Sequence, residues 1–185
     1  MRLLGIDEAG RGCIAGPLCV AGAVLHDEIK GLTDSKKLSE KKREELFPLI
    51  QKNSDYHVVF KSAKEVDKKG ISTCMKEALE EILQKLSHDK VIFDGNTTFG
   101  VIGLETLVKA DLKVPAVSGA SILAKVSRDR YMKEVAKKYP HYGFEKHKGY
   151  GTKAHRELIA KHGQCNEHRK SFKIKSLQQG SLFDF

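Results

Sequence analysis

The 185-residue sequence has no apolar run long enough to cross a membrane, and its N-terminus lacks the charged-then-apolar pattern of a signal peptide. Its four cysteines include no Cys-x-x-C pair, which argues against a disulfide framework. The chain also lacks internal repeats and a low-complexity linker. We therefore expect a cytoplasmic protein with reduced thiols and one main domain.

The charge balance is strongly basic. The chain carries 33 Lys and Arg against 24 Asp and Glu, a formal net charge of +9. Such a balance suits a polyanionic partner, although a merely soluble basic protein would show it equally well. Charge alone therefore favours a nucleic acid without identifying one.

The order of predicted elements indicates an α/β domain with a central mixed sheet flanked by helices. Apolar runs predict strands, and a 3.6-residue periodicity, clearest at 71–86, predicts helices. The predicted strands are 2–7, 17–25, 56–60, 91–93 and 113–117, and the predicted helices are 39–52, 71–86, 119–138 and 152–162. We expect one catalytic domain over residues 1–172, with a C-terminal helical segment, and a flexible tail at 173–185.

Two adjacent carboxylates end the first predicted strand. Asp7 and Glu8 follow Leu3-Leu4-Gly5-Ile6, and Gly10-Arg11-Gly12 comes directly after them. Consecutive acids after a buried strand cost desolvation energy without an evident structural gain. Strand-end carboxylates can hold a hard cation, and the backbone amides of a glycine turn can hold a phosphate or a ribose. The segment therefore suggests metal-assisted chemistry on a nucleic acid.

Asp94 and Asp111 extend this set of acids. Asp94 ends the strand 91–93, and Asp111 precedes another apolar stretch. Sites in open α/β sheets form outside such strand ends, where four carboxylates would repel one another unless cations neutralised them. Mg²⁺ suits such a site, and two metal ions can assist phosphodiester hydrolysis. The alternative is that each acid caps a turn or helix, which Asp94-Gly-Asn would fit well by itself.

Ordered motifs across nearly the whole chain resemble the ribonuclease HII family, the type 2 ribonucleases H of bacteria. The matching segments are Gly5-Ile-Asp-Glu-Ala-Gly-Arg-Gly12, Gly16-Pro17, Asp34-Ser-Lys-Lys-Leu38, Asp94-Gly-Asn96, Ala120-Ser-Ile-Leu-Ala-Lys-Val126, Arg128-Asp129, Tyr142-Gly-Phe144, His147-Lys-Gly-Tyr150 with Thr152 and His155, His168-Arg169 and Ser171-Phe172. The related type 3 enzymes typically lack the Gly-Arg-Gly of the first motif.

This resemblance implies a ribonuclease H-like fold and an endonuclease. The expected activity cleaves the RNA strand of RNA–DNA hybrids and incises 5′ of single ribonucleotides in duplex DNA, leaving 5′-phosphate and 3′-hydroxyl ends. The family's catalytic, metal-binding acids correspond to Asp7, Glu8, Asp94 and Asp111. The expected cofactor is Mg²⁺ or Mn²⁺, since both accept oxygen ligands.

The resemblance also implies which residues select the substrate. Backbone groups of Gly10, Arg11 and Gly12 would read a 2′-hydroxyl, the group that distinguishes RNA from DNA. Tyr150 would stack on the following deoxynucleotide. Several lysines would contact phosphates, with Lys36 the strongest candidate among Lys36, Lys37, Lys125, Lys146 and Lys148. Each of these lysines taken singly also fits a solvated surface charge.

The last residues suggest a partner. Gln179-Gly-Ser-Leu-Phe183 is similar to the pentapeptide by which bacterial proteins bind the replication sliding clamp. Leu182 and Phe183 would fill an apolar pocket, and Gln179 would supply hydrogen bonds. The alternative is that the segment packs on its own domain, because short motifs often match by chance.

Two other functions remain open from the sequence. One is a hybrid-specific nuclease of the type 3 kind, with little activity on single ribonucleotides. The other is a non-catalytic, clamp-associated module that binds nucleic acid, which four intact acids argue against because they would weaken phosphate binding. We expect a monomer in each case.

Overall fold

One mixed five-stranded sheet forms the centre of the computed structural model, which describes residues 1–32 and 37–174. The strand order is β3-β2-β1-β4-β5. The neighbours β1, β2 and β3 are antiparallel, whereas β4 and β5 run parallel to β1. The strands are β1 Leu3–Ala9, β2 Leu18–Leu25, β3 Ser54–Lys61, β4 Lys90–Asp94 and β5 Glu105–Leu107.

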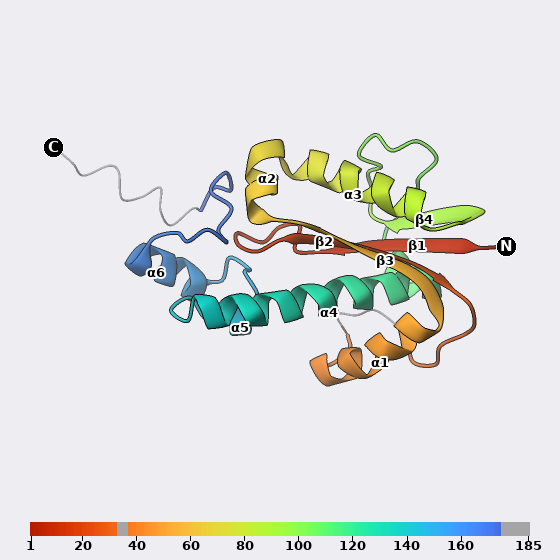
Figure 1. Ribbon diagram of the computed structural model, residues 1–185, viewed down its shortest axis with the longest axis horizontal. Coiled ribbons are helices and arrows are strands. Elements are labelled where there is room, and N and C mark those ends of the chain that lie inside the picture. The colour runs from red at the N-terminus through yellow and green to blue at the C-terminus, as the bar shows by residue number, and fades with distance from the viewer. Residues whose placement is uncertain (33–36, 175–185) are drawn as a thin grey trace.

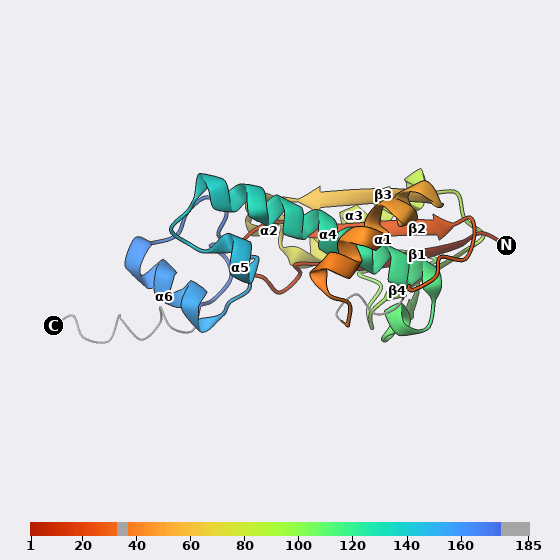
Figure 2. The same ribbon diagram turned by 90° about the horizontal axis from the view of Figure 1, so that it is seen from below.

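Helices cover both faces of this sheet. Figures 1 and 2 show α2 and α3 on one face, α4 and α1 on the other, and α5 and α6 beyond one end of the sheet. The helices are α1 Glu40–Lys52, α2 Ala63–Lys69, α3 Ile71–Lys85, α4 Pro115–Lys138, α5 Phe144–His147 and α6 Lys153–His162, with a 3₁₀ turn η1 at Ala110–Leu112. The expected α/β architecture, a central mixed sheet flanked by helices, is confirmed.

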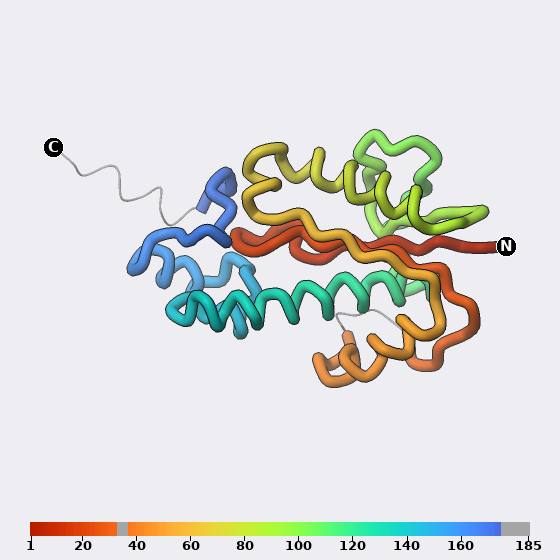
Figure 3. Tube along the Cα trace, viewed as in Figure 1, coloured from red at the N-terminus to blue at the C-terminus, as the bar shows by residue number. Residues whose placement is uncertain are grey.

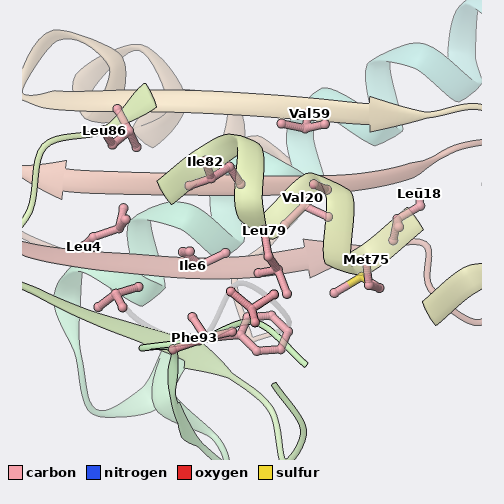
Figure 4. Packing of buried hydrophobic residues seen from close by; sticks show 14 of the residues in the cluster. Leu4, Ile6, Leu18, Val20, Val59, Met75, Leu79, Ile82, Leu86 and Phe93 are labelled. Carbon is pink, nitrogen blue, oxygen red and sulfur yellow. The ribbon is translucent and has the colours of Figure 1, made fainter. Parts of the chain in front are cut away.

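The apolar stripe of α3 packs against the central strands. Its buried residues Met75, Leu79 and Ile82 meet Leu4 and Ile6 of β1 in one hydrophobic cluster, seen in Figure 4. This is the stripe that the periodicity of 71–86 predicts. Packing of this kind positions β1, so that the acids at its end are held by a rigid strand.

Helix α4 lies directly on the opposite face of β1. The approach is so close that a Cβ on Gly5 would lie 2.2 Å from the backbone nitrogen of Val117. Much of α4 is buried, including Ser121, Arg128 and Asp129. The helix therefore brings polar side chains under the end of the sheet where β1 terminates.

The predicted strand at 113–117 is wrong, because Pro115 is the first residue of α4. Proline is favoured there, since its fixed φ suits a helix start and the missing N–H would have no intrahelical partner. Helices α2 and α5 and strand β5 were not predicted, and each has seven residues or fewer. No helix in the described part of the chain is long and apolar enough to cross a membrane.

Candidate functional site

Three carboxylates converge beside the ends of β1 and β4. Ile6 pairs with Phe93 across these parallel strands, so Asp7 and Asp94 are the next residues on each strand. Asp111 comes from η1. One carboxylate oxygen from each of the three residues lies within 4.8 Å of the others. The structure thus brings together three of the four acids singled out in the sequence.

Local hydrogen bonds hold Asp111 in this position. The Ala110 amide donates to Oδ1 of Asp94 at 3.2 Å, which ties η1 to the end of β4. The hydroxyl of Ser118 donates to the Asp111 carbonyl at 2.6 Å, which ties η1 to α4. Lys109, just before η1, adopts a left-handed φ of 58° that turns the chain into this position. The third carboxylate is therefore placed by the turn between β5 and α4.

Burial makes this cluster electrostatically costly. Asp7 is 8% exposed and Asp111 3% exposed. Burial is the main cause that raises the pKa of Asp7 well above its usual value, and the charges of Glu8 and Asp94 raise it further. Hydrogen bonds from Ser121 and from the Glu8 amide, at 2.8 Å, oppose this increase. A bound cation would offset the repulsion, so the donor set fits a divalent metal.

Glu8 lies at the margin of the cluster. Side chains alternate along β1, so Glu8 shares the face of Ile6, opposite Asp7. Its Oε1 is 3.9 Å from Arg11, and burial raises the pKa of its carboxyl group. Its Oε2 is buried and has no hydrogen-bond partner in the described structure. An unpartnered buried carboxylate oxygen on a residue that interacts with Asp7 and Asp94 also fits a cation or a metal-bound water.

Two fully buried arginines hold the loop that runs from the 10–12 turn to Pro17. Arg169 donates to the carbonyls of Gly10, Arg11 and Gly16 at 2.7 to 3.0 Å. Arg128 donates to the carbonyls of Ala15, Pro17 and Lys148 at 2.7 to 2.9 Å. Each guanidinium offers five donors in a rigid plane, which suits several carbonyls at once. Both arginines are 0% exposed, so the groups that anchor this loop lie in the core.

The turn itself depends on its glycines. Gly10 has a φ of 82°, and a Cβ there would lie 1.9 Å from Nε of Arg128. A Cβ on Gly12 would meet nothing within 4 Å, so the turn is open on that side. The exposed guanidinium of Arg11 lies 4.9 Å from the Phe99 ring centre. Buried arginine side chains therefore lie against one side of the turn, and its other side is open to solvent.

Tyr150 lies beside this turn. The carbonyl of Gly149 accepts hydrogen bonds from the amides of Ile14 and Ala15, at 3.0 and 3.2 Å. The Tyr150 hydroxyl and the Cys13 thiol share a hydrogen bond, and burial raises the pKa of both groups. Figure 3 shows how the loop after β1 meets chain segments that follow α4. Tyr150 stays 43% exposed, so its ring is available to a ligand.

The lysines that were expected to contact phosphates differ in their burial and in their partners. Lys125 pairs with Asp129 at 2.8 Å and lies 5.5 Å from the Tyr150 ring centre. Lys148 is buried and donates to the carbonyl of Glu145. Lys36 lies outside the described residues, as do Gln179, Leu182 and Phe183. The ammonium group of Lys125 therefore lies over the ring of Tyr150.

Sequence reasoning quoted Arg128 and Arg169 only as parts of motifs and missed their role. A glycine-rich loop leaves many carbonyls without partners in regular structure, and only a multivalent donor can satisfy several of them. That need is a signal for buried arginine, but it does not indicate which of the chain's arginines meets it.

The Ribonuclease HII family model matches residues 4–175. A ribonuclease HII of Sulfurovum sp. (strain NBC37-1) is 58% identical over 181 residues, which covers 98% of this chain and 96% of that protein. In a PCNA:RNase HII complex from Archaeoglobus fulgidus, a chain with 32% identity superposes with a TM-score of 0.81, covering 94% of this chain and 96% of that one. Ribonuclease H2 from Pyrococcus horikoshii OT3 gives a TM-score of 0.80 at 28% identity, with 97% and 98% coverage. These matches over nearly the whole length show that the chain belongs to the ribonuclease HII family of ribonuclease H endonucleases.

Proposed function

We propose that this enzyme cleaves the RNA strand of RNA–DNA hybrids and incises duplex DNA on the 5′ side of a single ribonucleotide. The observation that carries this proposal is the position of the Asp7–Asp94–Asp111 cluster next to a turn at residues 10–12 that Arg169 anchors and that is exposed at Arg11 and Gly12. The carboxylates that would bind the metal and the turn that would select the ribonucleotide are then adjacent at one end of the sheet. The expected products carry 5′-phosphate and 3′-hydroxyl ends.

Asp7, Asp94 and Asp111 would hold Mg²⁺ or Mn²⁺, and Glu8 would contribute its unpartnered Oε2 at the margin. A divalent cation bound there supplies Lewis-acid chemistry, which activates water and stabilises negative charge on the reacting phosphate. The chain's own contribution is to hold the carboxylates in place. Ser121 and the Glu8 amide orient Asp7, and the Ala110 amide orients Asp94.

Substrate choice would depend on the turn at residues 10–12 and on Tyr150. The open side of Gly12 allows a ribose to approach the backbone closely, and a backbone contact cannot move with a side-chain rotamer. The exposed ring of Tyr150 would stack against the following deoxyribose, where a second 2′-hydroxyl would clash. Lys36 and other surface lysines would add affinity through phosphates without base specificity.

The test compares two duplexes of equal length, one with a single embedded ribonucleotide and one with a continuous RNA strand. The proposal expects cleavage of both and a reduced preference for the single-ribonucleotide duplex in Tyr150→Ala. The matched control is Tyr56→Ala, since Tyr56 is also exposed but lies on the edge strand β3, which β2 separates from β1. Cleavage of the continuous hybrid alone would instead indicate a type 3-like enzyme.

We also propose that residues Gln179, Leu182 and Phe183 bind the replication sliding clamp. Support comes from the similarity of Gln179-Gly-Ser-Leu-Phe183 to clamp-binding peptides and from the structural relative solved with PCNA. The test removes residues 179–185, which should abolish clamp binding while hydrolysis of a short duplex stays nearly unchanged. A large loss of activity on that duplex would indicate that the segment packs on its own domain.

We propose, finally, that the enzyme works as a cytoplasmic monomer. All four cysteines are free thiols, as expected for a reducing compartment. Sedimentation equilibrium should give a mass near the 20.6 kDa of one chain, and a mass near twice that value would contradict the proposal.

A further inference from the structure

Three histidines lie directly behind Tyr150. Nδ1 of His155 is 2.8 Å from the Tyr150 carbonyl, and its Nε2 is 3.1 Å from Nε2 of His168. His147 stacks on His155 with ring centres 3.9 Å apart. His155 is 0% exposed and His168 1% exposed. None of these rings reaches the carboxylate cluster, so the proposed hydrolysis assigns them no role.

The hydrogen bonds fix the proton positions along this chain of rings. The backbone amide of Cys165 donates to Nδ1 of His168 at 2.8 Å, so that nitrogen carries no proton. The proton of His168 is therefore on Nε2, which donates to Nε2 of His155. His155 then carries its own proton on Nδ1 and donates it to the carbonyl of Tyr150. Each hydrogen bond in this chain of groups therefore donates in the direction from Cys165 to Tyr150, and we call the chain the His168–His155 relay.

This arrangement requires both rings to be neutral. Burial lowers the pKa of His155 and of His168 to about 4. At physiological pH each ring then has one donor and one acceptor, as the relay needs. A second proton on either ring would place a donor against the Cys165 amide or bring two donors together between the rings.

His147 supports the neighbouring residue in the same way. Its Nδ1 accepts from the Gly149 amide at 3.1 Å, so its Nε2 donates to the Tyr142 carbonyl at 2.5 Å. Gly149 has a φ of 85°, and a Cβ there would lie 2.2 Å from the Ala15 carbonyl oxygen. The histidines therefore hold the backbone of residues 149 and 150 against the loop that carries the 10–12 turn.

We propose that the His168–His155 relay is a positioning device that fixes Tyr150 against the 10–12 turn and thereby sets the preference for a ribonucleotide–deoxyribonucleotide junction. The inference rests on the proposed role of Tyr150 as the residue that reads this junction. His155 and His168 do not touch the reacting atoms. They act through the Tyr150 backbone, which also receives a hydrogen bond from the Thr152 amide at 2.8 Å.

The first test replaces His155 and measures kcat/KM on the single-ribonucleotide duplex and on the continuous hybrid. His155→Leu removes the donor to Tyr150 and should lower the ratio of the two values about three- to tenfold, the effect of losing one buried hydrogen bond. His155→Asn keeps an amide donor at the δ position and should restore the ratio to within about twofold of wild type. His162→Leu, on the same helix but exposed, is the control and should leave the ratio unchanged.

The second test needs no variant. Long-range ¹⁵N–¹H NMR of the wild-type enzyme should show His155 protonated on Nδ1 and His168 on Nε2. The opposite tautomers would overturn the relay and would leave the proposed function untouched.

The outcomes separate the relay from the role of Tyr150. If Tyr150→Ala lowers the ratio but His155→Leu does not, the relay is refuted and the junction-reading role stands. If His155→Leu lowers both kcat/KM values in parallel, the histidines are structural only and the proposal is wrong. If Tyr150→Ala itself leaves the ratio unchanged, the role of Tyr150 fails and the relay has no part in substrate choice.

Discussion

Replacing Asp7 with asparagine should separate the stability of the protein from its activity. Asp7→Asn keeps the side-chain shape and an oxygen that can accept from the Glu8 amide, but it removes one charge from the buried cluster. Because burial and neighbouring acids raise the pKa of Asp7, its ionised form is disfavoured in the folded protein. Without metal, the variant should therefore be more stable than wild type.

The magnitude follows from the geometry. Two unit charges 4.8 Å apart repel by about 3.5 kcal/mol at an effective dielectric constant of 20, and Asp7 takes part in two such pairs. Partial protonation of the cluster relieves much of this repulsion. We expect Asp7→Asn to raise the free energy of unfolding by about 1–3 kcal/mol, or roughly 2–12 °C in Tm for a domain of this size.

Bound Mg²⁺ should make the wild-type protein more stable than the Asp7→Asn variant. At a free Mg²⁺ concentration one hundred times Kd, binding adds about 2.7 kcal/mol to the stability of the wild-type protein. The variant has lost a ligand and should gain much less. Turnover should fall at least about a hundredfold in the variant, whereas duplex binding through basic residues should persist.

The assay is thermal unfolding of both proteins in EDTA and over a Mg²⁺ titration, followed by circular dichroism. The matched control is Asp67→Asn, because Asp67 instead accepts hydrogen bonds from the Lys170 and Ser171 amides and its pKa lies below the usual value. This control should lower Tm in both conditions. A lower Tm for Asp7→Asn in EDTA, or equal stabilisation of both Asp7 forms by Mg²⁺, would refute the reasoning.

Four further predictions follow from the same geometry. Arg169→Met should cost at least about 3 kcal/mol of unfolding free energy in urea, because three carbonyls lose a charged donor. Gly10→Ala should lower cleavage far more than duplex binding in a gel-shift assay, since its φ of 82° strains any side chain. The free energy of unfolding should fall as the pH drops from about 6.5 to about 4, by up to about 3 kcal/mol for each of His155 and His168. The reason is that these histidines are protonated at a higher pH in the unfolded chain than in the folded protein. Urea titrations at several pH values measure this loss. Deletion of residues 179–185 should remove clamp binding in surface plasmon resonance without changing Tm.

The clustered acids were largely predictable because strand ends are visible in the sequence. Asp7 and Asp94 each follow a short apolar run, and parallel pairing of those runs makes their ends neighbours. Asp111 was a candidate because it precedes an apolar stretch, and the family resemblance supported it, whereas its position depends on hydrogen bonds from Ala110 to Asp94 and from Ser118 to Asp111. Such contacts between distant segments leave no local pattern in the sequence.

The support behind the turn at residues 10–12 was less predictable. Gly10 and Gly12 are visible as a turn, but the buried guanidinium groups beneath it come from residues more than 100 positions away. The histidines behind Tyr150 look like ordinary polar residues in the sequence, and their tautomers follow only from the backbone groups they meet. The strand predicted at 113–117 failed for a local reason, because an apolar run that contains proline also fits a helix start.

The most direct measurement is cleavage-site mapping on a DNA duplex that carries one ribonucleotide, with and without Mg²⁺. We predict a single metal-dependent incision 5′ of the ribonucleotide, with a 3′-hydroxyl on the upstream DNA, a 5′-phosphate on the ribonucleotide, and no incision by Asp7→Asn. Cleavage that persists in EDTA, cleavage by Asp7→Asn at the wild-type rate, or an intact duplex in Mg²⁺ would contradict it.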